Sequence, residues 1–253
     1  MSNNIVLKVE NLKRHYTVEV GNEEIQNIPV LNGLNFEVEE GELVGIMGRS
    51  GCGKTTLLKT LGLIARPNGG EIWYKERKVS NIYGDDLAEI RRKELGFVFQ
   101  DFYLMDSLSV LENIMMPLIF NEDDIEESKK KAMDIAEKFQ ISHLIHKKPY
   151  ELSGGEKQRT AICRTLVGDP TLIFGDEPTG NLDSKSAKVV IEALAQINKE
   201  LKKTIILVTH DPIIAGYCSR IIFLKDGEIL GDIRKTGTNE DFYECVIEKM
   251  KEL

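Results

Sequence analysis

The sequence predicts an α/β protein, and three observations support this prediction. Short apolar runs of strand type alternate with stretches of helical spacing along most of the 253 residues. Three runs in the second half, 172–174, 205–208 and 221–224, are continuously apolar, as strands are when both faces of a central sheet are covered. A glycine-rich segment follows one apolar strand and opens a helical pattern, so that strand, loop and helix come in the order of a βα unit.

The first hundred residues contain the N-terminal strands and the first helix. Alternating apolar and polar side chains predict strands over 5–9 and 30–39. The run 43–47 is a short apolar strand, and 54–64 has apolar residues at helical spacing. A further strand is predicted over 71–74, after a turn rich in glycine.

Residues 101–149 depart from this pattern and are mostly helical. An acidic stretch at 121–128 precedes three lysines at 129–131, and this order of charge suits the dipole of a helix. The acidic stretch is either a recruitment patch or a solvated helix face, and the solvated face is the simpler interpretation. Helical spacing recurs over 156–167 and 241–253. The simplest organisation is therefore an α/β core with a helical insert.

The composition is that of an ordinary globular chain and argues against several classes of protein. Lys and Arg number 33 against 41 Asp and Glu, and the net charge of −8 argues against a dedicated nucleic-acid binder. No run of 18 uncharged apolar residues is present, so no membrane span is expected, and the first ten residues lack the regions of a signal peptide. Four widely spaced cysteines predict reduced thiols in the cytoplasm, with neither disulfides nor a zinc site.

The glycine-rich segment matches the pattern G-x-x-x-x-G-K-[ST] of phosphate-binding loops. Its glycines let backbone N–H groups curl around a phosphate, and the helix that follows presents its positive N-terminal end. Lys54 is expected to contact the β- and γ-phosphates of a nucleotide, and the Thr55 hydroxyl is expected to bind Mg²⁺. The residues expected to bind the nucleotide in this loop are Gly48, Arg49, Ser50, Gly51, Cys52, Gly53, Lys54, Thr55 and Thr56.

Cys52 stands at a variable position of this loop and has two interpretations. A helix N-terminus lowers the pKa of a thiol, which would make Cys52 a redox switch. A small, tolerated side chain is the simpler interpretation, because the backbone binds the phosphate at these positions.

Two carboxylates end a later apolar strand and fit the same chemistry. Asp176 and Glu177 follow the run 171–175, and side chains alternate along a strand, so the two point in different directions. One carboxylate can hold Mg²⁺ through water, while the next orients or deprotonates the attacking water of a hydrolysis. Alone, such a pair also serves to end a strand. Downstream of a phosphate-binding loop it indicates a site that hydrolyses a nucleotide.

Between the loop and the two carboxylates lies the segment LSGGEKQR, residues 152–159. Ser153, Gly154, Gly155 and Glu156 begin a helix and form a second N-terminus that can receive an anion. The segment closely resembles the signature motif of ABC-type ATPases, although that family usually has Gln where Glu156 stands. The resemblance covers nearly the whole chain. It implies a P-loop NTPase core with a mixed or parallel sheet, an N-terminal antiparallel β subdomain and an inserted α-helical subdomain.

Further motifs of the family assign roles to single residues. By this resemblance Tyr16 stacks on the adenine of ATP, Gln100 in FVFQ contacts Mg²⁺ and the attacking water, and His210 in VTHDP reaches the γ-phosphate. Asp183 in GNLD belongs to the D-loop. A core tyrosine is the alternative for Tyr16. The resemblance implies the catalytic residues Glu177, His210 and Gln100 and the metal-binding residues Thr55, Gln100 and Asp176.

The resemblance also implies the assembly in which the chain works. A single ABC ATPase domain would span 1–253, with a core over about 1–100 and 150–253 and the helical subdomain over about 101–149. In the family, the signature of one subunit closes over the γ-phosphate held by the other, which implies a homodimer formed on ATP binding. The segment 102–113 resembles the one that docks the coupling helix of a membrane permease.

Local motifs narrow the resemblance to one group of transporters. GDEPTGNLD at 175–183 and THDP at 209–212 are similar to the group that serves macrolide export, lipoprotein release and bacitracin-type peptide resistance, and the tail is most similar to the peptide-resistance ATPases. The resemblance implies an ATPase held on the inner face of the cell membrane by a multi-span permease, with a sensor kinase as a further partner through the permease. The alternatives are the ATPase of a lipoprotein-release, macrolide-efflux or cell-division complex, and a soluble ABC ATPase of iron–sulfur cluster assembly.

Overall fold

The computed structural model describes residues 4–20 and 24–253, which divide into two compact units. The first unit comprises the described residues up to 88 together with 204–253, and the second comprises 89–203. Helix α2 (Gly84–Lys93) runs across the boundary. Residues 1–3, part of the segment considered for a signal peptide, lie outside the described residues.

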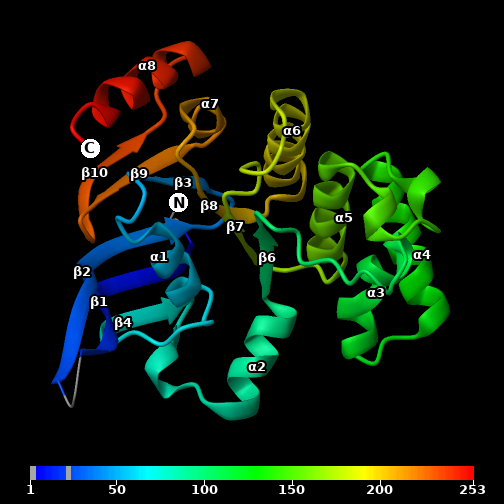
Figure 1. Ribbon diagram of the computed structural model, residues 1–253, viewed down its shortest axis with the longest axis horizontal. Coiled ribbons are helices and arrows are strands. Elements are labelled where there is room, and N and C mark those ends of the chain that lie inside the picture. Colours follow the sequence, from blue (N-terminus) through cyan, green and yellow to red (C-terminus); the bar gives the residue numbers. More distant parts are fainter. Residues whose placement is uncertain (1–3, 21–23) are drawn as a thin grey trace. The chain divides into compact units, whose positions relative to one another are not determined.

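An antiparallel sheet in the first unit contains the N-terminal strands (Figure 1). Both predicted strands are present. Each is longer than predicted, because the hydrogen-bonded pairing of β1 with β2 continues through polar residues that do not alternate with apolar ones. Where apolar and polar residues do alternate, the apolar ones are buried: Leu7 and Val9 on one strand, and Leu34 and Val38 on the other. The strands lie in the order β2 (Glu24–Glu39), β1 (Ile5–Val20), β4 (Gly69–Tyr74) and β5 (Arg77–Lys78).

The first unit also contains a mixed set of strands that supports the glycine-rich loop. Strand β3 pairs in parallel with β8 and with β9, while β10 runs antiparallel to β9. Every residue of β3 and β8 is buried, as their continuous apolar runs predict. The order is β10 (Glu228–Arg234), β9 (Arg220–Lys225), β3 (Leu43–Met47) and β8 (Thr204–Val208). The helical elements are α1 (Lys54–Leu61), η1 (Val79–Asn81), α7 (Pro212–Ala215) and α8 (Asn239–Met250).

Two parallel strands and two long helices form the first part of the second unit. Strand β6 (Leu95–Phe99) pairs with β7 (Leu172–Asp176), and Phe99 lies opposite Asp176. Helix α5 (Gly154–Val167) packs against β6 and against α6 (Ser184–Leu201).

The rest of the second unit is helical, as the sequence predicts for 101–149. Helices α3 (Val110–Phe120) and α4 (Ile125–Lys138) pack against each other and against α5, followed by the short turns η2 (Ser142–Leu144) and η3 (Pro149–Glu151). Their common core consists of aliphatic side chains such as Val110, Ile114, Leu118, Ile141 and Leu144. The exact limits of a helical subdomain stay a prediction.

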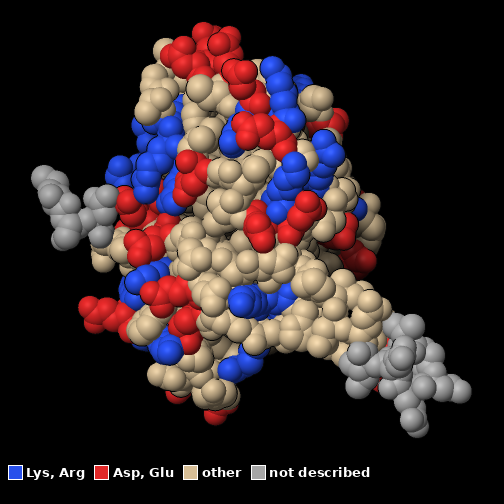
Figure 2. Space-filling view, turned by 90° about the vertical axis from the view of Figure 1, so that its left-hand side faces the viewer, with Lys and Arg blue, Asp and Glu red and all other residues tan. Residues whose placement is uncertain are grey.

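Charged side chains of both signs are mixed on the one face of the molecule that Figure 2 shows. On the face drawn in Figure 2, Lys and Arg lie among Asp and Glu and among uncharged residues. Such mixing is the ordinary arrangement of a solvated surface. Within residues 4–20 and 24–253, no helix combines the length and the hydrophobicity that a membrane span requires.

Candidate functional site

The glycine-rich loop connects β3 to α1 in the first unit. Gly53 is the N-cap of α1 and has a φ of 103°, a conformation that a residue with a Cβ adopts only under strain. A Cβ at this position would also lie 2.9 Å from the Val30 carbonyl oxygen. Among the described side chains none caps the start of α1, so its first N–H groups are placed to bind a ligand.

Lys54 folds back over the loop that precedes it. Its side chain is buried, and Nζ donates to the carbonyl oxygens of Gly48 at 2.8 Å and Arg49 at 2.9 Å. An ammonium group has three N–H donors, so these two bonds leave one to contact a phosphate. The lysine thus holds the loop curled around the space that a phosphate would enter.

Tyr16 of β1 lies beside the start of α1. Its hydroxyl is 3.3 Å from Thr56 Oγ1, and the Arg14 guanidinium carbon lies 5.2 Å from the centre of its ring. The Tyr16 side chain is 42% exposed, so it does not occupy a core position. The structure therefore brings Tyr16 and the phosphate-binding loop together within the first unit.

His210 follows strand β8 at the edge where β3 also ends. Thr209 N–H donates to the Ile46 carbonyl at 3.1 Å, and its hydroxyl accepts from Asp211 N–H at 3.0 Å. The carboxyl ends of neighbouring parallel strands meet at one edge of a sheet. The phosphate-binding loop and the His210 loop are therefore neighbours in the first unit.

The second unit brings Gln100, Asp176 and Glu177 to one edge of its own strands. Gln100 follows β6 directly, and Asp176 ends β7 opposite Phe99. Glu177 has a φ of 45°, which for a residue with a side chain costs on the order of 1 kcal/mol. Strained backbone of this kind persists only where the surrounding structure enforces it.

The signature segment begins α5 with a capping box. The Ser153 N–H and hydroxyl both donate to Glu156 Oε2 at 2.7 Å, and the Glu156 N–H donates back to Ser153 Oγ at 3.4 Å. These bonds from Ser153 hold the pKa of Glu156 below its ordinary value. Glu156, which stands where the family usually has Gln, therefore performs the capping that either residue can perform.

Asp183 is the N-cap of α6. Its carboxylate accepts from Lys185 N–H and Ser186 N–H at 3.0 Å each, and from the Ser186 hydroxyl at 2.7 Å. The hydrogen bond from the Ser186 hydroxyl is the main reason that the pKa of Asp183 lies below its ordinary value. These bonds anchor the C-terminal end of the segment GNLD, which is predicted to be the D-loop, to the start of α6.

Comparison with known proteins decides the family. The family model described as "ABC transporter" matches residues 31–180. The chain belongs to the ABC transporter family. It is 42% identical over 248 residues to the uncharacterized ABC transporter ATP-binding protein YvcR of Bacillus subtilis, covering 98% of this chain and 95% of the relative. It is 41% identical over 230 residues to the bacitracin export ATP-binding protein BceA of Halalkalibacterium halodurans, covering 91% and 89%.

A solved ABC cassette has the same fold. The dimeric, post-hydrolysis structure of the ATP-binding cassette MJ0796 of Methanocaldococcus jannaschii, bound to ADP and Pi, matches with a TM-score of 0.82 at 39% identity. The match covers 91% of this chain and 99% of that chain. The predicted family, fold class and ATPase activity are confirmed, and the chain is an ATP-binding subunit of the ABC exporter type.

Cys52 of the ABC ATPase is a buried thiol. Burial raises its pKa above the ordinary value and outweighs the lowering influence of the Lys54 charge. The backbone N–H groups at the start of the helix also lower this pKa, as the redox interpretation requires, but burial outweighs them. The interpretation of Cys52 as a small, tolerated side chain agrees with the structure.

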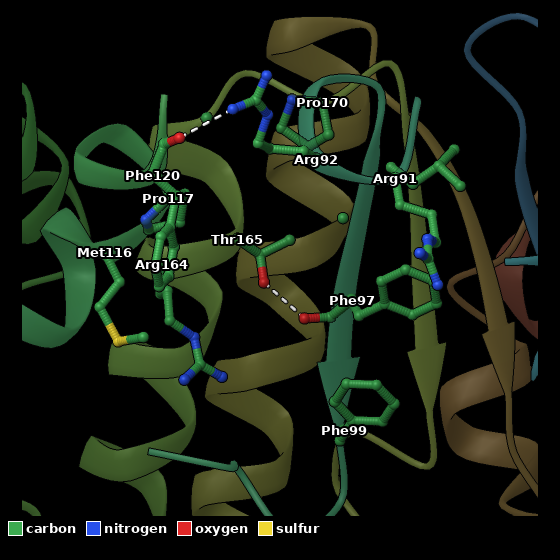
Figure 3. Close-up of a pocket in the computed structure, with 13 residues that line it drawn as sticks. Arg91, Arg92, Phe97, Phe99, Met116, Pro117, Phe120, Arg164, Thr165 and Pro170 are labelled. Atoms are coloured by element: carbon green, nitrogen blue, oxygen red, sulfur yellow. Dashed lines mark hydrogen bonds between the residues drawn. The ribbon is translucent and has the colours of Figure 1, made fainter. Parts of the chain in front are cut away.

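A pocket of about 350 Å³ lies in the second unit of the ABC ATPase (Figure 3). Arg92 donates to the Phe120 carbonyl at 2.8 Å and thereby joins α2 to α3, and Thr165 donates to the Phe97 carbonyl at 2.6 Å and thereby joins α5 to β6. Its lining combines cationic and apolar side chains, among them Arg91, Arg92, Arg164, Met116, Pro117 and Phe120.

Three polar residues that organise the second unit have no predicted role. Gln158 Nε2 donates to the Phe99 carbonyl at 3.2 Å and to the Pro178 carbonyl, which joins the ends of β6 and β7. Arg164 donates to the carbonyls of Phe102 and Tyr103, and Asn181 bonds to Gln100 and its neighbour. Gln158 belongs to the segment LSGGEKQR, and its place in this motif is the sequence signal that could have identified it.

The side chains predicted to hold Mg²⁺ carry suitable atoms. Thr55 offers a hydroxyl, Gln100 an amide oxygen and Asp176 a carboxylate, and Mg²⁺ prefers oxygen ligands. The described residues contain no cluster of three His, Cys, Asp or Glu side chains that would form an all-protein metal site. A donor set with few carboxylates fits Mg²⁺ in nucleotide sites, where phosphates and waters complete the coordination.

Proposed function

We propose that this ABC ATPase drives a separate membrane permease that exports antimicrobial peptides or confers resistance to them. The observation that carries the proposal is the similarity to a bacitracin export ATP-binding protein, which extends over 91% of the chain at 41% identity. The cargo is selected by the permease, so the ATPase contributes the energy and the timing of transport.

In this proposal the first unit binds the nucleotide. Tyr16 stacks on adenine, which suits its exposed ring, and the loop from Gly48 to Thr56 binds the phosphates through backbone N–H groups. Two of the three N–H groups of the Lys54 ammonium are bonded to the loop, and the third donates to a phosphate oxygen. His210 steadies the γ-phosphate from the neighbouring loop.

The second unit supplies the groups for hydrolysis. Glu177 polarises the attacking water, and Asp176 and Gln100 each offer Mg²⁺ an oxygen ligand, as Thr55 of the first unit does; Mg²⁺ when bound would neutralise the charge of the phosphates. A positioned carboxylate typically contributes 10²–10⁴-fold as a general base. The enforced backbone at Glu177 suits such a role, because strained conformations concentrate at functional positions.

A second copy of the chain completes each ATP site in this proposal. The signature residues Ser153, Gly154, Gly155 and Glu156 of one subunit face the γ-phosphate bound by the other, and Asp183 belongs to the D-loop of the same interface. The N-terminus of α5 is suited to an anion in principle, because the backbone N–H groups of Gly154 and Gly155 and the positive end of the helix dipole lie there. The similar cassette MJ0796 is dimeric in its ADP and Pi complex.

We place the contact with the permease at the pocket of Figure 3 and at the adjoining segment 102–113. Arg164 connects the two, because it lines the pocket and donates to the carbonyls of Phe102 and Tyr103. A membrane partner would hold the ATPase at the inner face of the cell membrane. A sensor kinase, where one is present, would be reached through the permease.

The proposal is tested by purifying the tagged chain in mild detergent from the membranes of the organism that produces it. We expect a multi-span permease to co-purify, and we expect bacitracin-type peptides to stimulate the ATPase activity of the complex. Stimulation by macrolides or lipoproteins alone, or recovery without any permease, contradicts the proposal. A sensor kinase in the same preparation would be identified by mass spectrometry.

Variants of the pocket test the docking site. Arg91→Glu and Phe120→Asp should abolish co-purification of the permease while the isolated chain keeps its ATPase activity. Tyr150→Asp is the matched control, because Tyr150 is an exposed aromatic residue of the same unit and does not line the pocket.

A further inference from the structure

Asn181 of the D-loop is bonded to the Gln100 segment at three points within the second unit. Gln100 Nε2 donates to Asn181 Oδ1 at 3.0 Å. Asn181 Nδ2 donates to the Gln100 carbonyl oxygen at 3.2 Å and to Asp101 Oδ1 at 3.0 Å. One short side chain therefore contacts both the side chain and the backbone of the proposed metal ligand.

The chemistry of these partners fixes the orientation of both amides. A carbonyl and a carboxylate accept hydrogen bonds and cannot donate them, so they require the nitrogen of Asn181. The Asn181 oxygen then faces Gln100 and requires a donor, which only the Gln100 nitrogen can supply. The Gln100 oxygen is consequently turned away from Asn181 and is the amide atom left to bind a cation.

We infer that Asn181 is a positioning residue that presents the Gln100 amide oxygen to Mg²⁺. The inference rests on the proposed function, in which Gln100 binds the metal. The oxygen and the nitrogen of an amide exchange places when the group rotates by half a turn. In the wrong orientation the Gln100 amide would direct its N–H donors at the cation. Asn181 prevents this rotation without touching the metal, as residues that orient metal ligands commonly do.

Gly180 permits the close approach that these bonds need. A Cβ built on Gly180 would lie 2.9 Å from both Cδ and Nε2 of Gln100. These atoms are near the end of a flexible side chain, so an alanine here would displace the Gln100 amide and leave the backbone in place. Gly180→Ala should therefore reproduce the effect of losing Asn181.

The test separates metal-dependent from metal-independent binding of ATP. In a Glu177→Gln background that prevents turnover, calorimetry gives the Kd of ATP with Mg²⁺ and with EDTA. We expect Asn181→Ala and Gly180→Ala to weaken binding with Mg²⁺ on the order of ten-fold and to leave binding in EDTA unchanged. Asn198→Ala is the control, because the Asn198 amide binds the Lys203 carbonyl at 2.8 Å, elsewhere in the same unit.

A second background isolates the orientation of the amide. In Gln100→Glu the two carboxylate oxygens are equivalent, so no residue is needed to choose between them. The Asn181 oxygen then faces a carboxylate that cannot donate to it, so adding Asn181→Ala to Gln100→Glu should leave the Mg²⁺-dependent affinity unchanged or raise it, a coupling that a double-mutant cycle measures.

Three outcomes would overturn the inference. Asn181→Ala could weaken ATP binding equally with and without Mg²⁺, which would make its role purely structural. The full effect could persist in the Gln100→Glu background, which would exclude orientation of the amide. If Gln100→Ala itself leaves the Mg²⁺-dependent affinity unchanged, the proposed metal role of Gln100 fails, a result distinct from the first two.

Discussion

Lys54 shows how one residue serves both the folded loop and its ligand. Its ammonium is already bonded to two loop carbonyls, so a phosphate meets a charge that is held in place. Lys54→Ala should lower ATP affinity at least ten-fold, since a hydrogen bond to a charged group contributes about 1.5–3 kcal/mol. Calorimetric titration with ATP measures this. Lys59→Ala, an exposed lysine of the same helix, is the control, and equal losses in both variants would contradict the assignment.

The cysteines differ in the reactivity that their surroundings allow. Cys52, Cys163 and Cys218 are buried and have raised pKa values, that of Cys218 reaching about 12, whereas Cys245 is exposed. A raised pKa lowers the thiolate fraction at neutral pH, and the thiolate is the nucleophile. Iodoacetamide at pH 7.5 should therefore modify Cys245 first, as peptide mass spectrometry can show. Early modification of Cys52 would restore the redox interpretation.

At the residue scale, the sequence predicts groups whose role belongs to a local motif. Lys54 and Thr55 follow from the spacing of one loop, and Ser153 and Glu156 follow from one helix start. Asn181 could not be predicted, because its partners Gln100 and Asp101 lie about eighty residues earlier. Contacts of this range depend on the pairing of β6 with β7, and no local pattern encodes that pairing.

The start of α5 is an element whose stability should depend on pH. Because the folded-state pKa of Glu156 lies below the ordinary value of 4.5, its contribution is present above that value and is lost as pH falls through the lowered pKa. In Glu156→Gln the amide oxygen accepts the same bonds at every pH. Urea unfolding from pH 7 to pH 3 should show a shallower loss of stability for this variant than for the native chain. In a Ser153→Ala background the difference should become smaller, because the hydroxyl donor is lost while the backbone N–H of residue 153 remains, and an unchanged difference would contradict the role of the Ser153 hydroxyl.

Buried charges join four segments of the first unit. Arg220 of β9 is 6% exposed and donates to Asp232 of β10 at 2.8 and 2.6 Å, to the Glu37 carbonyl at 2.7 Å and to Glu42 at 3.3 Å. Arg220→Met leaves Asp232 without its cation and Glu42 with Arg234 alone, and it should cost about 3–5 kcal/mol of unfolding free energy. Chemical denaturation measures this. Arg234→Met removes the exposed cation that pairs with Glu39 and Glu42 and should cost about 1 kcal/mol or less. Equal costs in the two variants would show that the burial of Arg220 does not determine its contribution to stability.

At the scale of elements, strands with strong periodicity are predictable and those with mixed character are not. Strand β3 has the predicted limits because all five of its residues are buried. Strand β10 was not predicted, since its side chains are exposed or half-buried and its order of polar and apolar residues follows no period. Strand β1 extends past its apolar part because pairing with β2 stabilises residues that lack strand character on their own.

For the whole molecule, the two compact units divide the chemistry between them. The phosphate-binding loop, Tyr16 and His210 belong to the first unit, whereas Gln100, Glu177 and the signature belong to the second. In the proposed function, the described residues of neither unit alone supply all the groups for ATP hydrolysis. This division follows from the order of motifs along the chain, because a segment from the middle of the sequence forms the second unit and interrupts the first.

ATP-dependent pairing of two chains is the prediction that belongs to the whole molecule. Glu177→Gln should bind ATP without hydrolysing it, so that two ATP molecules remain between two copies of the chain. Size-exclusion chromatography with light scattering should then show a dimer of twice 28.6 kDa with ATP and a monomer with ADP. Ser153→Arg in the same background should bind ATP yet stay monomeric, because a bulky cation would occupy the place of the signature at the partner's phosphate. A monomer in Glu177→Gln with saturating ATP would contradict the shared site, whereas a dimer without nucleotide would show that pairing does not require the γ-phosphate.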